Sequence, residues 1–144
     1  MGGRYHEYQK VLAGGGGVFV YMMITDFIIH GLILKGCYST PEFQYLWRPA
    51  GEMINWLMWV SRLIFSFVFV FIFTKGYEQK GLAEGLRFGL YIALLLTLTR
   101  ILMNYATQPI SFSLAIYWFV LETIQLVIAG LVAAAIYRPA MAEG

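Results

Sequence analysis

Four ionisable residues lie inside long apolar stretches of this chain: Asp26, Arg62, Arg100 and Glu122. Two are acidic and two are basic, so their formal charges cancel. A charged side chain in hydrocarbon costs roughly 2.5–3.5 kcal/mol even on the permissive insertion scale, and such residues turn inward and pair. These residue types support two kinds of chemistry: ion pairing that holds helices together, or the binding and transfer of a proton, an ion or a ligand.

Further polar residues stand at helical spacing from these charges. His30 follows Asp26 by four residues, and Asn104 follows Arg100 by four. Residues three or four apart share a helix face, so the members of each pair point the same way. Asn55 lies on the same stripe of its predicted helix as Arg62, and Gln125 follows Glu122 by three residues. The predicted polar layer therefore comprises Asp26, His30, Asn55, Arg62, Arg100, Asn104, Glu122 and Gln125.

Spacing along the helices predicts which residues belong to this layer, but it does not determine which acidic residue pairs with which arginine. We expect Glu122 to pair with Arg62 and Asp26 to pair with Arg100, and the exchanged pairing stays open. Polar contacts and close packing hold membrane helices together, so a purely structural role is one interpretation of the layer. A site that binds or conducts a ligand and a catalytic site are the other two.

Four apolar stretches must position these residues. Each is long enough to cross a hydrocarbon core of about 30 Å, which needs roughly 20 residues. Lysine–glycine pairs, an asparagine and prolines mark their ends. We therefore expect an all-α integral membrane protein, a single domain over residues 1–144, with four transmembrane helices in a bundle. The predicted helices span residues 14–34, 53–74, 82–103 and 112–136.

Composition agrees with a membrane protein. Of the 144 residues, 60% are hydrophobic and 12% are charged, whereas soluble domains carry about 25% charged residues. The net charge of +2 and the dispersed basic residues argue against a nucleic-acid partner. No small-residue cleavage site follows a short apolar core near the N-terminus, so the first stretch is interpreted as a retained signal-anchor helix.

The residues outside the helices predict an orientation. Residues 37–51 contain two prolines around a short aromatic segment, which is interpreted as an interfacial segment or, equally, as an ordered loop. Lysine and arginine are more frequent on the cytoplasmic side of membrane proteins. One side holds six and the other holds Lys35 and Arg48, so both termini are expected in the cytoplasm. The six are Arg4, Lys10, Lys75, Lys80, Arg87 and Arg138.

Small residues predict close helix packing. Gly81, Gly85, Gly89 and Ala93 recur at spacing four, a pattern that lets two membrane helices approach closely. The four consecutive glycines at 14–17 are interpreted as a flexible or kinked entry to the first helix, or alternatively as a site of close approach by a neighbouring helix or a lipid.

Cofactor and catalytic motifs are not found in the sequence. Cys37 is the only cysteine, which excludes an intramolecular disulfide and a CxxC pair. His30 is the only histidine inside a predicted span, so a two-histidine haem would have to be shared across a homodimer. Asp26, His30 and Glu122 are suitable metal ligands, but the two nearby arginines would repel a cation. No GxSxG or HExxH motif occurs, so we expect no enzyme, no metal and no cofactor.

The second half of the chain has a recognisable sequence of motifs. It includes TKGYEQKG from Thr74, EGLRFGL from Glu84, NYAT from Asn104, ETIQ from Glu122 and IYRP from Ile136. Over roughly residues 50–139 the chain resembles an uncharacterised family of small bacterial four-helix inner-membrane proteins. The resemblance implies a multi-pass topology in the bacterial inner membrane, and it implies no activity and no functional residues.

Three functions remain open at this point. The first is a non-catalytic accessory or scaffold subunit of a larger membrane assembly, with membrane lipids and other membrane-protein subunits, or a second copy of itself, as partners. The second is a small oligomeric transporter or channel that uses the charged layer. The third is a small membrane enzyme that acts on a lipid or a quinone. Tiny loops and a packing ridge favour the first.

Overall fold

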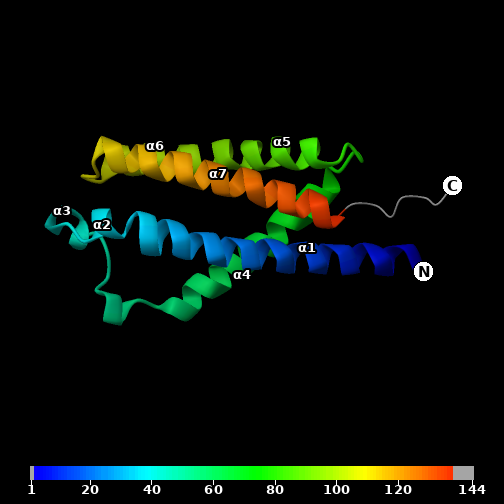
Figure 1. Ribbon diagram of the computed structural model, residues 1–144, viewed down its shortest axis with the longest axis horizontal. Coiled ribbons are helices and arrows are strands. Elements are labelled where there is room, and N and C mark those ends of the chain that lie inside the picture. Colours follow the sequence, from blue (N-terminus) through cyan, green and yellow to red (C-terminus); the bar gives the residue numbers. More distant parts are fainter. Residues whose placement is uncertain (1, 138–144) are drawn as a thin grey trace.

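The computed structural model describes residues 2–137 of the chain, and this part is helical with short connections. Four helical stretches in it are long and apolar enough to span a membrane: Tyr5–Ile33, Asn55–Lys75, Leu82–Thr107 and Phe112–Tyr137. The predicted all-α class is therefore confirmed. Figure 1 shows three of the stretches running side by side, while helix α4 crosses α1 obliquely.

The first helix begins earlier than predicted. Helix α1 spans Gly2–Asp26 and continues as the π-helical segment η1, Phe27–Ile33. The prediction that the helix starts at residue 14 is wrong, because the four glycines lie inside it. A Cβ atom placed on Gly15 would lie 2.7 Å from the Phe67 ring, and one on Gly17 would collide with Ile136. The glycines therefore provide close approach for two other helices.

The segment between the first two long helices folds into short helical turns. These are α2, Lys35–Tyr38, then α3, Pro41–Gln44, and the 3-10 turn η2, Ala50–Glu52. Phe43 of this segment is buried in a cluster with Leu114 and Trp118. The segment is too short to span a membrane, and it packs onto the bundle as an ordered cap.

Helix α4, Asn55–Lys75, contacts the rest of the chain through only part of its length. Its buried residues are Ser66, Phe69, Val70 and Phe73, all in its second half. Every residue from 55 to 61 is exposed. Figure 1 shows why: α4 crosses α1 at a large angle, and its first half projects away from the other helices.

The third stretch packs tightly along the fourth. It consists of α5, Leu82–Ile92, the π-helical segment η3, Ala93–Leu98, and α6, Thr99–Thr107. The fourth is α7, Phe112–Tyr137. A Cβ atom on Gly89 would lie 2.7 Å from Val127 Cα, and one on Gly85 would overlap the carbonyl oxygen of Gly130. Because these neighbours are backbone atoms, the two helices touch through their main chains.

Two members of the predicted packing ridge differ in role. Ala93 is fully buried in the main core. Gly81 lies just before α5 with a φ of +73°, and no heavy atom lies within 4 Å of where its Cβ would be. The prediction that Gly81 packs against a neighbouring helix is wrong: its backbone conformation is the left-handed one that glycine favours, and it makes the turn into α5.

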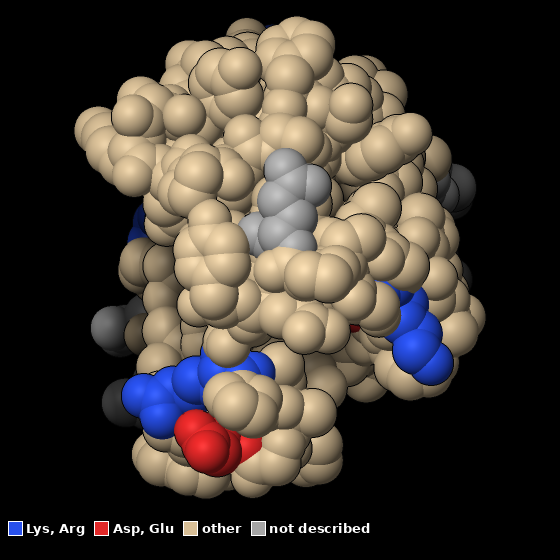
Figure 2. Space-filling model, turned by 90° about the vertical axis from the view of Figure 1, so that its left-hand side faces the viewer, with Lys and Arg blue, Asp and Glu red and all other residues tan. Residues whose placement is uncertain are grey.

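The start of α1, the α4–α5 connection and the end of α7 lie at the same end of the bundle (Figure 1). Figure 2 views the opposite end, where most of the surface is uncharged and the basic side chains lie toward its edges. Arg138 and Pro139, which the sequence predicts to stop the last helix, lie outside the described residues, as do the side chain of Arg4 and residue 1.

Candidate functional site

An ion pair joins α1 to α4 where the two helices cross. Arg62 donates through Nη2 to Asp26 Oδ1 at 2.9 Å and through Nε to Asp26 Oδ2. This two-point geometry is the strong form of an arginine–carboxylate contact, because the planar guanidinium matches both oxygens. The Arg62 and Asp26 side chains are 32% and 21% exposed. The pair thus lies at the inner edge of the projecting half of α4.

Helix α7 adds an uncharged partner to this pair. Gln125 is 3% exposed, and its Nε2 donates to Asp26 Oδ1 at 2.9 Å and to Thr25 Oγ1 at 2.7 Å. The Thr25 hydroxyl donates in turn to the carbonyl of Tyr21 at 2.9 Å. The Tyr21 hydroxyl returns to the carbonyl of Gln125 at 3.2 Å. Three helices therefore meet at one carboxylate.

A second ion pair joins α6 to α7. Arg100 Nη2 donates to Glu122 Oε2, and the two side chains are 45% and 17% exposed. The predicted pairing of Glu122 with Arg62 and of Asp26 with Arg100 is therefore wrong. The positions of the four charged residues along their helices bring them to one level of the bundle. Which acidic residue pairs with which arginine depends on which helices are neighbours. Helix α4 crosses α1, whereas α6 runs along α7.

Each charged pair adjoins a π-helical segment. Segment η1 begins directly after Asp26, and η3 ends two residues before Arg100. Short π-helical stretches inside α-helices often occur at functional sites. Their wider winding changes which residues share a face, so the α-helical spacing rule that grouped Asp26 with His30 does not apply across η1. His30 makes its hydrogen bond elsewhere.

His30 belongs to an aromatic cluster at the capped end of the bundle. Its Nδ1 lies 2.7 Å from the hydroxyl of Tyr38, and Trp118 Nε1 donates to the same hydroxyl at 2.8 Å. Trp47 packs edge-on to Trp118 with ring centroids 6.1 Å apart. Asp26, Glu122 and both arginines lie within electrostatic range of His30. The cluster is therefore next to the two ion pairs without being hydrogen-bonded to them.

Tyr38 connects this cluster through a single hydroxyl group. Burial raises the pKa of Tyr38 to about 12, and the hydrogen bond from Trp118 opposes this effect. The phenol therefore stays protonated at physiological pH and can donate to His30 while accepting from Trp118. The sequence placed Trp118 four residues before Glu122 but gave no signal for Tyr38, which lies in the cap 80 positions away from Trp118.

Two residues of the predicted layer lie apart from it. Asn55 is exposed at the beginning of α4, in the half that projects from the bundle. Asn104 is half-buried near the end of α6. Within residues 2–137 neither side chain makes a hydrogen bond. The prediction that both join the polar layer is wrong, because α4 splays at Asn55 and the layer ends at Arg100.

A further buried carboxylate organises the α4–α5 connection. Glu84 is 4% exposed, and it accepts hydrogen bonds from the backbone N–H of Glu78, through Oε1, and of Lys80 at 3.0 Å, through Oε2. It stands three residues after the N-cap Gly81, a position from which a glutamate can reach back to preceding N–H groups. The exposed Glu78 pairs with Lys80, whose hydrogen bond and charge hold the Glu78 pKa below its usual value.

The arrangement neutralises every charge that the apolar spans carry near their middle. Across residues 2–137 no group of three histidine, cysteine, aspartate or glutamate side chains is placed to hold a metal ion. Comparison with protein-family models, with curated proteins and with solved structures finds no match to this chain.

Proposed function

We propose that this chain is a non-catalytic, multi-pass protein of the bacterial inner membrane, with both termini in the cytoplasm, that serves as an accessory or scaffold subunit of a larger membrane assembly. The four long apolar stretches support the membrane location. The excess of lysine and arginine near the termini and the α4–α5 connection supports the orientation. The resemblance to small bacterial four-helix inner-membrane proteins is a further reason to propose the bacterial inner membrane.

The observation that carries the proposal is the exposed first half of α4. Membrane helices associate through packing and polar contacts, yet every residue from 55 to 61 is exposed. This half carries large side chains, including Trp56 and Trp59, which are 66% and 60% exposed. A helix anchored by one half and presenting the other is suited to dock a second membrane protein.

The ion pairs favour the same role. Asp26 is already bound by Arg62 and Gln125, and Glu122 is bound by Arg100. The first pair connects α1 to α4, and the second connects the consecutive helices α6 and α7. The Asp26–Arg62 pair thereby stabilises the angle at which α4 leaves the bundle, and this angle is what presents its first half.

The test is gentle purification in native-like lipid, followed by native mass measurement of the wild-type chain and two variants. Trp59→Ala truncates the proposed docking face. Tyr91→Ala is a matched control, because Tyr91 is also an aromatic residue that is 60% exposed, on α5. We expect a stoichiometric foreign subunit to accompany the wild type and the control, and to be lost from Trp59→Ala at unchanged protein level. A chain that always purifies alone as a monomer contradicts the proposal.

An oligomeric transporter or channel is the second candidate, and one observation favours it. The Asp26–Arg62 pair keeps part of its surface exposed and directly follows the exposed residues 55–61 of α4, so a second copy docked on α4 could cover it. In the same native mass experiment this function predicts a clean homo-oligomer. Asp26→Asn would then abolish flux through reconstituted vesicles while leaving the oligomer intact.

A further inference from the structure

The cap, residues 35–52, is attached to two of the long helical stretches through one hydroxyl group. The Tyr38 hydroxyl of α2 lies 2.7 Å from Nδ1 of His30, which belongs to η1. Trp118 Nε1 of α7 donates to the same hydroxyl at 2.8 Å. Within residues 2–137 this hydroxyl makes no other hydrogen bond. The position of Tyr38 therefore depends on what these two side chains can donate and accept.

The direction of both hydrogen bonds follows from the chemistry of the three groups. An indole N–H can only donate, so Trp118 occupies a lone pair of the Tyr38 oxygen. Burial raises the pKa of Tyr38 to about 12, so its hydroxyl keeps its hydrogen. Nδ1 of His30 is the one acceptor within reach of that hydrogen. All three groups are satisfied when Nδ1 carries no proton, which is the neutral imidazole with its hydrogen on Nε2.

A proton on His30 Nδ1 is incompatible with this arrangement. It turns the only acceptor for the Tyr38 hydrogen into a donor. Two donors then face one hydroxyl oxygen, and the hydrogen of Tyr38 has no partner within residues 2–137. A buried donor without an acceptor is costly. Because the imidazole is the side chain that ordinarily changes its charge between about pH 5 and pH 8, mild acid opposes the attachment of the cap.

The charged residues around His30 form two neutral pairs. Asp26 and Glu122 lie within electrostatic range of the ring, and so do Arg62 and Arg100. Each carboxylate is bound to one of the two arginines. A protonated His30 therefore meets no unpaired carboxylate among these four residues, and Tyr38 is the neighbour that responds to its protonation.

The aromatic packing limits how far this response extends. Trp47 packs on Tyr38 with ring centroids 5.6 Å apart and edge-on to Trp118 at 6.1 Å. It is 42% exposed, so it can move outward with Tyr38. Phe43 of the same cap is buried, and it stays anchored whatever the state of His30. Loss of the Tyr38 bond should therefore loosen the cap locally without unfolding the bundle.

We propose that the cap is a pH-sensitive element: a proton on His30 Nδ1 breaks the hydrogen bond from Tyr38 and loosens residues 38–47, and loss of that proton restores the attachment. The inference is independent of any partner docked on α4. In the orientation proposed above the cap lies on the side away from the cytoplasm, so it would respond to acidity outside the cell.

The test is hydrogen exchange of the full chain in mild detergent at about pH 8 and about pH 5, on either side of the ordinary imidazole range. Each rate is divided by the intrinsic rate at the same pH to give a protection factor. We expect protection of residues 38–47 to fall at least about fivefold at the lower pH, as for one lost hydrogen bond. Residues 82–92 of α5 are the internal reference and should keep their protection.

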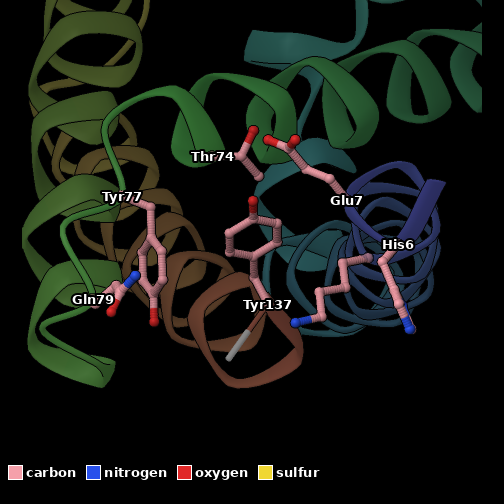
Figure 3. A pocket seen from close by; sticks show the side chains of 7 residues that line it. His6, Glu7, Thr74, Tyr77, Gln79 and Tyr137 are labelled. Atoms are coloured by element: carbon pink, nitrogen blue, oxygen red, sulfur yellow. The ribbon is translucent and has the colours of Figure 1, made fainter. Parts of the chain in front are cut away.

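Three variants assign the effect to a residue. His30→Asn places an amide oxygen near the position of Nδ1 and cannot be protonated, so protection should stay high at both pH values. Tyr38→Phe lacks the hydroxyl, so protection should be low at both. His6→Asn is the matched control, because His6 is the other histidine of the chain. Figure 3 shows it in the first turns of α1 near the end of α7, away from the cap.

Equal protection of residues 38–47 at the two pH values in the wild type overturns the proposal. A pH effect that persists in His30→Asn, or that disappears in His6→Asn, also overturns it, because the titrating group is then not His30. If His30→Asn does not fold, Tyr38→Phe decides. A fall in protection as large as that of the wild type would show that the Tyr38 hydroxyl has no part in the effect, whereas low protection at both pH values supports the proposal.

Discussion

Arg62 of α4 binds both carboxylate oxygens of Asp26 on α1, with Nη2 2.9 Å from Oδ1 and Nε on Oδ2. The two residues are 36 positions apart in the chain. This contact is made at the crossing of the two helices, just before α4 projects from the bundle. The angle between α1 and α4 therefore depends on a charged pair as well as on the apolar packing around Val70 and Phe73.

Exchanging the charges tests this pairing directly. Asp26→Asn leaves Arg62 without its carboxylate, and we expect a loss of roughly 3 kcal/mol in the free energy of unfolding, the low end for an orphaned buried charge, because the pair is partly exposed. Asp26→Arg combined with Arg62→Asp should recover much of the loss, although Gln125 is then placed beside an arginine. Unfolding in mixed micelles, followed by circular dichroism, gives the values.

The control for this exchange uses the other acidic residue. Glu122→Arg combined with Arg62→Glu should give no recovery relative to its single variants, because Glu122 is bound to Arg100. Recovery in this second exchange and not in the first would show that the charges pair in the opposite way.

The second ion pair should be worth less to stability than the first. Arg100 is 45% exposed and stands seven residues before the end of α6 at Thr107, about 10 Å along the helix. A long arginine side chain can reach the interface from there. We therefore expect Glu122→Gln to lower the unfolding free energy by less than Asp26→Asn in the same micelles. If Glu122→Gln lowers the unfolding free energy as much as Asp26→Asn or more, the Arg100 side chain does not reach the interface when its carboxylate partner is removed.

Because α5 packs closely on α7, the effect of a glycine-to-alanine substitution on stability should depend strongly on which glycine is changed. Gly85→Ala should destabilise the chain by roughly 2 kcal/mol or more, because the added methyl group meets the carbonyl of Gly130, which belongs to a backbone that has to move. Gly16→Ala should be neutral or stabilising by up to about 1 kcal/mol, because no atom lies within 4 Å and alanine favours a helix. Thermal unfolding of the two variants side by side measures the difference. Similar effects at both positions would contradict backbone contact between α5 and α7.

The carboxylate of Glu84 predicts a local effect in the α4–α5 connection. It accepts two backbone N–H groups while almost fully buried. Glu84→Gln removes the charge and turns an NH₂ group toward one of those donors, so we expect a loss of about 1.5–3 kcal/mol. Glu78→Gln at the exposed neighbouring pair should leave the stability almost unchanged, because solvent screens that pair. Proteolysis and hydrogen exchange of residues 76–81 should increase in the first variant alone.

Tyr38 predicts a stability change at high pH. Because its pKa is raised from 10.0 to about 12 in the folded chain, the folded state holds the phenolic proton more tightly than the unfolded state. The resulting stabilisation is fully present below pH 10 and is lost as the pH rises through about 12. Tyr38→Phe should be less stable at neutral pH by about 1–2 kcal/mol, since His30 and Trp118 lose their shared partner.

The measurement is the difference in unfolding temperature between wild type and Tyr38→Phe across that pH interval. The two curves should converge as the pH rises, because the wild type loses a contribution that the variant never had. If the difference in unfolding temperature stays constant across this pH interval, the loss of stability does not come from ionisation of the Tyr38 hydroxyl. Tyr45→Phe is a suitable control, because Tyr45 is 65% exposed in the same cap.

The sequence alone determined the all-helical class of the protein, its four long apolar stretches and the level of the charges along them. Long apolar stretches need no tertiary information to be identified, and the three later helices end within two residues of their predicted limits, except that α6 runs to Thr107. The close-packing role of Gly85 and Gly89 was also accessible, because small residues at spacing four mark a contact face whichever helix fills it.

Tertiary structure decided the partners. Four charges at one level permit two pairings, and only the crossing of α1 by α4 assigns Arg62 to Asp26. Across the π-helical segment after Asp26, His30 faces the cap, where it bonds the Tyr38 hydroxyl that Trp118 reaches from a distant part of the chain. Spacing in the sequence specifies how far along the helix axis a residue lies and on which face of the helix, because both follow from the rise and the rotation per residue. Which helix lies alongside is a property of the packed bundle, and it sets every contact between helices.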